Sequence, residues 1–279
     1  MLHRHPGSLR TLAGLTDSDV DACNTQAHDL RAIEIGDADR QSGDSAREPL
    51  HFALFAPLHY ERNYAYPLLI WLHGPQDQEQ QLRQVMPHIS LRNYVAVGPR
   101  GTAPDNHPHA PLGVGGFTWD HSPRGVEQAE QRVLRCLELA AQKFHISRRR
   151  IFVAGLESGG TMALRLALRQ PRLFAGGLSL GGAFPDSAAP LAKLHEAREL
   201  PLFITTCKES QLYPEHQVCE QLRLFHAAGL NMMLRQYPGE DGLTDLMLAD
   251  MDRWLMEQIN QPRRSVSAAQ AWAPTELTS

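Results

Sequence analysis

Between about residue 50 and residue 260, short apolar runs alternate with longer segments of helical periodicity. Buried strands are predicted for the apolar runs 50–57, 67–73, 94–100, 151–155, 174–180, 200–207 and 231–237. Helices are predicted over 125–144, 161–170, 214–229, which ends on Gly229, and 243–259. Strands that alternate with helices predict an α/β fold with a mostly parallel central sheet and helices on both faces. In such a sheet, binding and catalytic groups gather at the carboxyl ends of the strands.

Polarity divides the chain into three parts. Residues 1–48 are rich in Asp, Arg, Ser and Gly, which predicts a disordered segment. Residues 49–262 hold the alternating pattern and are predicted to form one domain, and residues 263–279 are predicted to be a flexible tail. With 279 residues, of which 42% are hydrophobic, the chain is long enough for one large domain with a packed core.

Composition excludes several classes of partner. The net charge of −4 gives no electrostatic case for nucleic acid or anionic membranes, and the basic run 148–150 is interpreted as a solvated turn. No run approaches the ~18 apolar residues of a membrane span, and the first residues lack a signal-peptide core. We therefore expect a cytoplasmic protein. The cysteines match no zinc motif, so no metal site and no cofactor are predicted; they are Cys23, Cys136, Cys207 and Cys219.

The junction at 155–160 holds the most informative motif. A buried strand passes directly into a helix through Gly-Leu-Glu-Ser-Gly-Gly, the context of the nucleophile elbow G-x-S-x-G. Gly155 and Gly159 bracket Glu157, so a glutamate takes the place of the nucleophile. Ser158 is the alternative nucleophile, but that register would put Leu156 where a glycine is needed. The simpler interpretation makes Ser158 a helix N-cap.

Several of these segments together resemble one branch of the α/β-hydrolases, the phospholipase/carboxylesterase type. The resemblance covers about residues 50 to 260 and rests on LLIWLHG at 68–74, VAVGPRG at 95–101, GGFTWD at 115–120, the elbow region and YPG at 237–239. It implies a fold whose ancestral chemistry is the hydrolysis of carboxylic esters. A small ester or acyl compound is therefore the ligand that the resemblance implies.

The same resemblance implies three catalytic positions, and none carries the usual residue. Serine, acid and histidine fall on Glu157, Ser210 and Asp241; Glu209 would replace Ser210 only if the turn shifted by one residue. A serine mechanism needs an imidazole to accept the hydroxyl proton, and aspartate is a far weaker base at neutral pH.

The oxyanion hole and the cleft are also defined only by the resemblance. The family uses a backbone N–H after the His-Gly pair, but Pro75 follows here and has no N–H. Gln76 would supply that donor if the loop is longer, and the N–H of Ser158 would be the other donor. Trp119 matches a position that lines the substrate cleft, with ordinary packing as the alternative.

Three hypotheses follow. The first is a catalytically degenerate hydrolase whose fold is kept for binding or regulation. The second is an active hydrolase with a non-standard site, in which Glu157 or Ser158 attacks and a loop histidine assists: His73, His107, His109 or His121. The third is a carboxylate cluster of Glu157 and Asp241 that shares a proton or holds a cation, with His73 as a further ligand. Its alternative is that one carboxylate points into solvent or pairs with Arg100.

Overall fold

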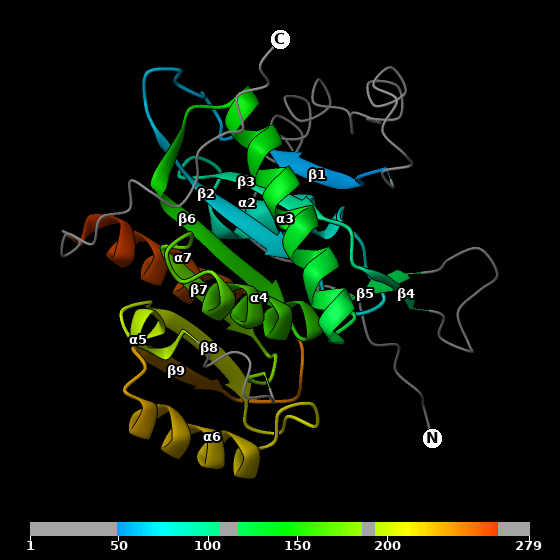
Figure 1. Cartoon of the computed structure of the whole chain (residues 1–279), viewed down its shortest axis with the longest axis vertical. Helices are drawn as coiled ribbons and strands as arrows, with labels where there is room; N and C mark the ends of the chain where they lie inside the picture. The colour runs from blue at the N-terminus through cyan, green and yellow to red at the C-terminus, as the bar shows by residue number, and fades with distance from the viewer. Residues whose placement is uncertain (1–48, 106–115, 186–192, 262–279) are drawn as a thin grey trace.

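A seven-stranded sheet forms the centre of the computed structural model, which describes residues 49–105, 116–185 and 193–261. The order of the strands is β1-β3-β2-β6-β7-β8-β9 (Figure 1). Their bounds are β1 Phe52–Phe55, β2 Tyr66–Leu72, β3 Val95–Pro99, β6 Ile146–Leu156, β7 Gly176–Leu180, β8 Leu202–Cys207 and β9 Met232–Tyr237. All neighbours pair in parallel except β1, which runs antiparallel to β3 at one edge. The predicted α/β architecture is therefore confirmed.

Helices cover both faces of this sheet. The helices are α2 Gln81–Ile89, α3 Pro123–Lys143, α4 Ser158–Arg169, α5 Leu194–Ala197, α6 Glu215–Ala228 and α7 Asp245–Asn260. One apolar core lies between the sheet and α3, α4 and α6, and a second lies between the sheet and α2 and α7. No helix among the described residues is long and apolar enough to cross a bilayer.

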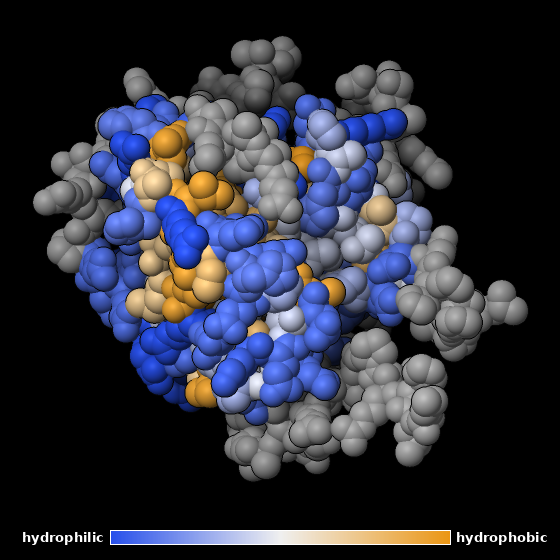
Figure 2. Space-filling view, turned by 90° about the horizontal axis from the view of Figure 1, so that it is seen from below, coloured by the Kyte–Doolittle hydropathy of each residue, from blue (hydrophilic) through white to orange (hydrophobic). Residues whose placement is uncertain are grey.

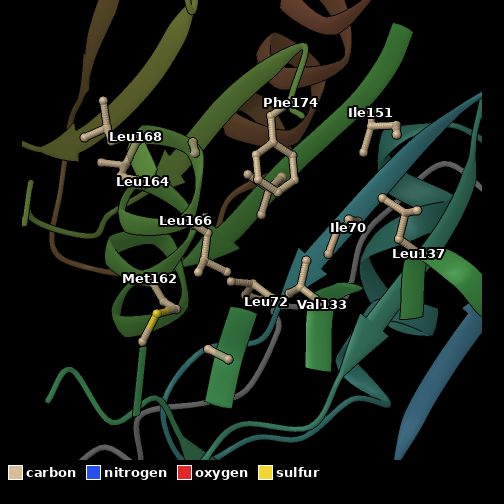
Figure 3. Packing of buried hydrophobic residues seen from close by; sticks show 14 of the residues in the cluster. Ile70, Leu72, Val133, Leu137, Ile151, Met162, Leu164, Leu166, Leu168 and Phe174 are labelled. Carbon is tan, nitrogen blue, oxygen red and sulfur yellow. The ribbon is translucent and has the colours of Figure 1, made fainter. Parts of the chain in front are cut away.

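Alternation along β2 shows how the sequence builds these two cores. Leu68, Ile70 and Leu72 face the first core, whereas Leu69 and Trp71 face the second, and all five side chains are buried. Successive side chains of a strand point to opposite faces, so a continuous apolar run is what a strand covered on both sides requires. Figure 3 shows the first core, where Ile70 and Leu72 of β2 face side chains of α3 and α4.

Four elements of the structure have no counterpart in the sequence prediction. Helix α2 contains Pro87 and begins in a glutamine-rich stretch, so its apolar face is hard to recognise in the sequence. Helix α5 is only four residues long. Strands β4 (Ala103–Asp105) and β5 (Gly116–Thr118) form a separate antiparallel pair. The predicted end of helix α6 is confirmed, because Gly229 takes a left-handed conformation with φ 69°.

Several sequence predictions concern residues outside the described ranges. These are the N-terminal segment 1–48, the tail 263–279, Cys23, and the histidines His107 and His109.

Candidate functional site

The junction between β6 and α4 adopts a sharp bend whose apex is Glu157. This residue has φ 48° and ψ −113°, a conformation that L-residues avoid. Its N–H donates to the carbonyl of Leu180 at 2.8 Å, and its carbonyl accepts from the N–H of Thr161 at 2.9 Å. The backbone on both sides thus holds the strained residue in place, and the side chain at the apex is a carboxylate.

Close backbone approaches explain the two glycines that bracket this apex. A Cβ on Gly155 would lie 2.4 Å from the carbonyl carbon of Gly159. A Cβ on Gly159 would lie 2.3 Å from the carbonyl oxygen of Leu72, in the neighbouring strand β2. Both distances are well below the van der Waals contact distance of a Cβ atom, so a side chain at either position would require the backbone to shift.

The carboxyl group of Glu157 lies in an environment that disfavours its charge. Partial burial, and then the nearby charge of Asp241, raise the pKa of Glu157 above its usual value. These two residues follow β6 and β9, which are separated in the sheet by β7 and β8. The fold thus brings Glu157 and Asp241 within electrostatic reach of each other at the carboxyl ends of the strands.

Ser158 is the first residue of α4, and Glu157 takes the N-cap position without a side-chain cap. The prediction that Ser158 caps the helix was therefore wrong. The backbone enters the helix one residue earlier, because the strained turn is centred on Glu157. The Ser158 hydroxyl instead lies 3.1 Å from the hydroxyl of Thr118, at the end of β5.

Ser210 and Asp241 both organise the loop that follows β8. The Ser210 hydroxyl accepts the N–H of Tyr213 at 2.8 Å. One carboxylate oxygen of Asp241, Oδ2, accepts the N–H groups of Gln211 and Leu212 at 2.7 and 3.1 Å. The other oxygen, Oδ1, is buried and has no hydrogen-bond partner in the described part of the chain. At the positions that the resemblance assigns to acid and histidine, the two side chains hold a turn.

His73 is fully buried and has both ring nitrogens occupied. Nδ1 lies 2.7 Å from the carbonyl oxygen of Gly74, and Nε2 accepts the N–H of Gly101 at 2.8 Å. Because Nε2 accepts a hydrogen bond, it carries no proton. The ring is therefore neutral, with its proton on Nδ1. Burial also lowers the pKa of His73. This histidine ties the end of β2 to the loop after β3 and is not available as a base or a ligand.

His121 lies just before α3 and is half-buried, with Nδ1 lacking a hydrogen-bond partner among the described residues. Burial, and then the nearby Arg165, lower the pKa of its ring. His226 lies on the exposed side of α6. Within the described ranges, no histidine forms a hydrogen bond to Glu157 or Asp241.

The candidate oxyanion loop follows β2, and its N–H groups are bound by side chains of α2 and β4. Pro75 has no N–H, and the N–H of Gln76, a residue with φ 58°, donates to the carboxylate of Asp105 at 3.1 Å. The Gly74 N–H donates to the side-chain oxygen of Gln81 at 3.1 Å. Of the candidate donors, only the N–H of Ser158 stands at the open start of a helix.

Trp119 lies in the core at 3% exposure, where its indole N–H donates to the carbonyl of His73 at 2.9 Å. This arrangement matches ordinary packing. Arg100 forms a two-bond ion pair with Glu79 at 2.6 and 2.7 Å, so it does not neutralise Glu157 or Asp241.

Cys207, the last residue of β8, belongs to the same region and was not singled out from the sequence. Its thiol is buried, and burial followed by the charges of Asp241 and Glu157 raises its pKa. The sequence feature that points to Cys207 is its position at the carboxyl end of a predicted strand, where functional groups gather. Despite this gathering of Cys207, Glu157 and Asp241, the described residues contain no group of three or more His, Cys, Asp or Glu side chains placed to hold a metal ion.

The raised pKa of Glu157 predicts a stability difference that depends on pH. A carboxyl whose pKa is higher in the folded than in the unfolded state costs stability once the pH exceeds its unfolded value, because the folded state then binds more protons. We expect Glu157→Gln to be more stable than the wild type at pH 7, with the advantage shrinking as the pH falls through the ordinary glutamate range. Urea denaturation at a series of pH values measures this. The matched control is Glu220→Gln, which removes the same charge at an exposed position in the middle of α6. A constant difference at all pH values would contradict the electrostatic explanation.

Several solved structures share this fold. SOBER1 from Arabidopsis thaliana is similar with a TM-score of 0.57 and 20% identity, over 70% of this chain and 100% of that one. A carboxylesterase from Bacillus cereus gives 0.56 and 14%, over 75% and 94%. The S-formylglutathione hydrolase FrmB of Staphylococcus aureus gives 0.52 and 15%, over 76% and 93%. At these identities the likeness establishes the fold alone.

Sequence comparison identifies the family. A search of curated proteins found no match. The family model described as "Putative esterase" matches residues 44–229, which is more than half of the 279-residue chain. The matched region contains the elbow and the loop after β8, and ends before Asp241. With its α/β-hydrolase fold, the chain belongs to this esterase family.

Proposed function

We propose that this chain is a pseudo-esterase: a member of the esterase family that does not hydrolyse esters and retains the fold to bind a small ester or acyl ligand or to serve a regulatory role. The single observation that supports this most is Glu157 at the apex of the elbow, with φ 48° and ψ −113°. The backbone geometry that presents a nucleophilic hydroxyl in a serine esterase here presents a carboxyl group.

The surroundings of Glu157 argue against hydrolysis as well. A serine mechanism requires an imidazole, and His73 uses both of its nitrogens in backbone hydrogen bonds. Asp241, at the histidine position, accepts two N–H groups of the neighbouring loop. Members of a catalytic triad act as a unit, and losing the unit costs on the order of 10⁶ in rate.

Attack by Glu157 or Ser158 is less well supported. Attack by the Glu157 carboxylate would form a covalent intermediate whose hydrolysis requires a base, and no histidine of the described ranges is hydrogen-bonded to Glu157. The Ser158 hydroxyl contacts Thr118 and no imidazole in the described part of the chain. A cation held by Glu157 and Asp241 would have only two protein carboxylates, fewer protein ligands than structural metal sites use.

Turnover of p-nitrophenyl butyrate tests the proposal. We expect the wild type to match both buffer and the variant with Glu157→Ala, Ser158→Ala and Asp241→Ala combined. Turnover that disappears in this variant would show a working site at the elbow, and turnover that survives would show a site elsewhere. Because an unhydrolysed ester stays intact, a rise in Tm on its addition would measure the binding role directly.

A further inference from the structure

Strand β9 is the last strand of the sheet, and its outer side carries backbone groups that have no partner within residues 49–105, 116–185 and 193–261. The carbonyls of Asn231 and Tyr237 accept the N–H groups of Leu202, which begins β8, and of Lys208, which follows it, at 2.9 and 2.8 Å. The odd-numbered residues of β9 therefore point their backbone groups inward. Backbone groups alternate in direction along a strand, so the N–H and C=O of Met232, Leu234 and Gln236 point outward. No described residue pairs with these six groups.

This edge lacks the features that natural proteins use to prevent pairing. Exposed edge strands are usually protected by lysines, prolines or bulges, and none of these occurs in β9. Its one charged residue, Arg235, is held within the chain by an ion pair with Asp250 at 2.6 Å. Apolar side chains are exposed on β9 and on α6, with Met233 at 38% and Leu224 at 66%. The face that carries α6 and β9, seen in Figure 2, shows apolar side chains gathered in one patch.

The three outward residues are arranged symmetrically about Leu234. If a second β9 lies antiparallel with Leu234 on the two-fold axis, Leu234 faces its own copy and Met232 faces Gln236 of the other chain. In each of these pairs, the N–H of each residue donates to the carbonyl of the residue opposite, so all six outward backbone groups gain a partner. On the α7 side, Met233 of each chain meets the aliphatic stem of Arg235 in the other. A strand that complements itself in this way fits a second copy of this chain.

We propose that the chain forms a two-fold homodimer by antiparallel pairing of β9 with β9 of a second copy, which joins two sheets into one. A closed two-fold contact of this kind uses the same surface on both subunits and leaves no edge at the interface open. The Glu157 site lies at the carboxyl ends of the strands and not on this edge, so the proposal is independent of the proposed function.

Light scattering with size-exclusion chromatography on the full chain provides the test. We expect a mass twice the 31.1 kDa of the single chain. Gln236→Pro removes one outward N–H at an exposed side chain without removing a bond to β8, so it should weaken the dimer. The matched control Gln236→Ala keeps the N–H and should leave the dimer intact. Far-UV circular dichroism checks that each variant is folded.

Charge changes at Met233 test the register, and remain decisive if the proline variant does not fold. Met233→Lys places a cation opposite Arg235 of the other chain twice, and should raise the dimer dissociation constant by about tenfold. Met233→Glu places an anion there and should leave the constant unchanged or lower it. A monomer for the wild type would overturn the proposal. A dimer of equal affinity in all of these variants would overturn it too, since the interface would then lie elsewhere.

Discussion

The variant that combines Glu157→Ser, Ser210→Asp and Asp241→His should hydrolyse p-nitrophenyl butyrate about 10²-fold or more faster than the wild type. The elbow already has the strained geometry that presents a nucleophile, with φ 48° at its apex. An aspartate at position 210 can accept the N–H of Tyr213 as the serine does, so this hydrogen bond of the loop after β8 should persist. Full family activity is not expected, because the Gln76 N–H is held by Asp105 and one oxyanion donor is worth about 10²–10³ in rate.

The matched control is the double variant of Glu157→Ser with Asp241→His, which lacks the acid. Without an acid to orient the imidazole, this pair should remain well below the triple variant. Both variants lose the Asp241 carboxylate that accepts the N–H groups of Gln211 and Leu212, so they differ only in the acid at position 210. Full activity from the double variant would show that Ser210 does not occupy the position of the acid.

Gly159→Ala should destabilise the fold by about 3 kcal/mol or more, or prevent folding. Its Cβ would lie 2.3 Å from the carbonyl oxygen of Leu72 and 2.4 Å from that of His73. Both atoms belong to backbone at the end of the central strand β2, so relief requires the helix and the sheet to move apart. Urea denaturation measures the loss.

Gly74→Ala is the control for this substitution. Its Cβ would meet the Leu156 side chain at 3.0 Å, and a leucine side chain can rotate away. The loss of stability should therefore be clearly smaller than for Gly159→Ala. Equal losses would mean that the tight packing at the elbow does not depend on Gly159.

Much of this architecture could be predicted from the sequence. The apolar runs located the seven strands of the main sheet, because a strand covered on both faces has few polar positions. The two glycines that bracket Glu157 also predict that this residue is the apex of the elbow. They mark the positions 155 and 159, where close backbone contacts leave no room for a side chain. Helix α2 could not be predicted so directly, since Pro87 lies inside it.

The roles of individual polar side chains depended on contacts between distant parts of the chain. The N–H of Gln76 is held by Asp105, 29 positions away, and Asp241 holds a loop about 30 positions before it. From the sequence, His73 is a candidate base or ligand, whereas in the fold its Nε2 is bound by the N–H of Gly101, 28 positions later. Neither periodicity nor spacing encodes such pairs, because each depends on how two loops meet at the end of the sheet.

Intact-mass spectrometry after treatment with a fluorophosphonate tests the central claim most directly. Such a probe forms a covalent bond only with a hydroxyl that a neighbouring base has activated. With a carboxyl group at the apex of the bend and no free imidazole beside it in the described structure, the full-length protein should keep its unmodified mass. A stoichiometric adduct that disappears in Ser158→Ala would contradict the account, because it would show an activated serine beside Glu157.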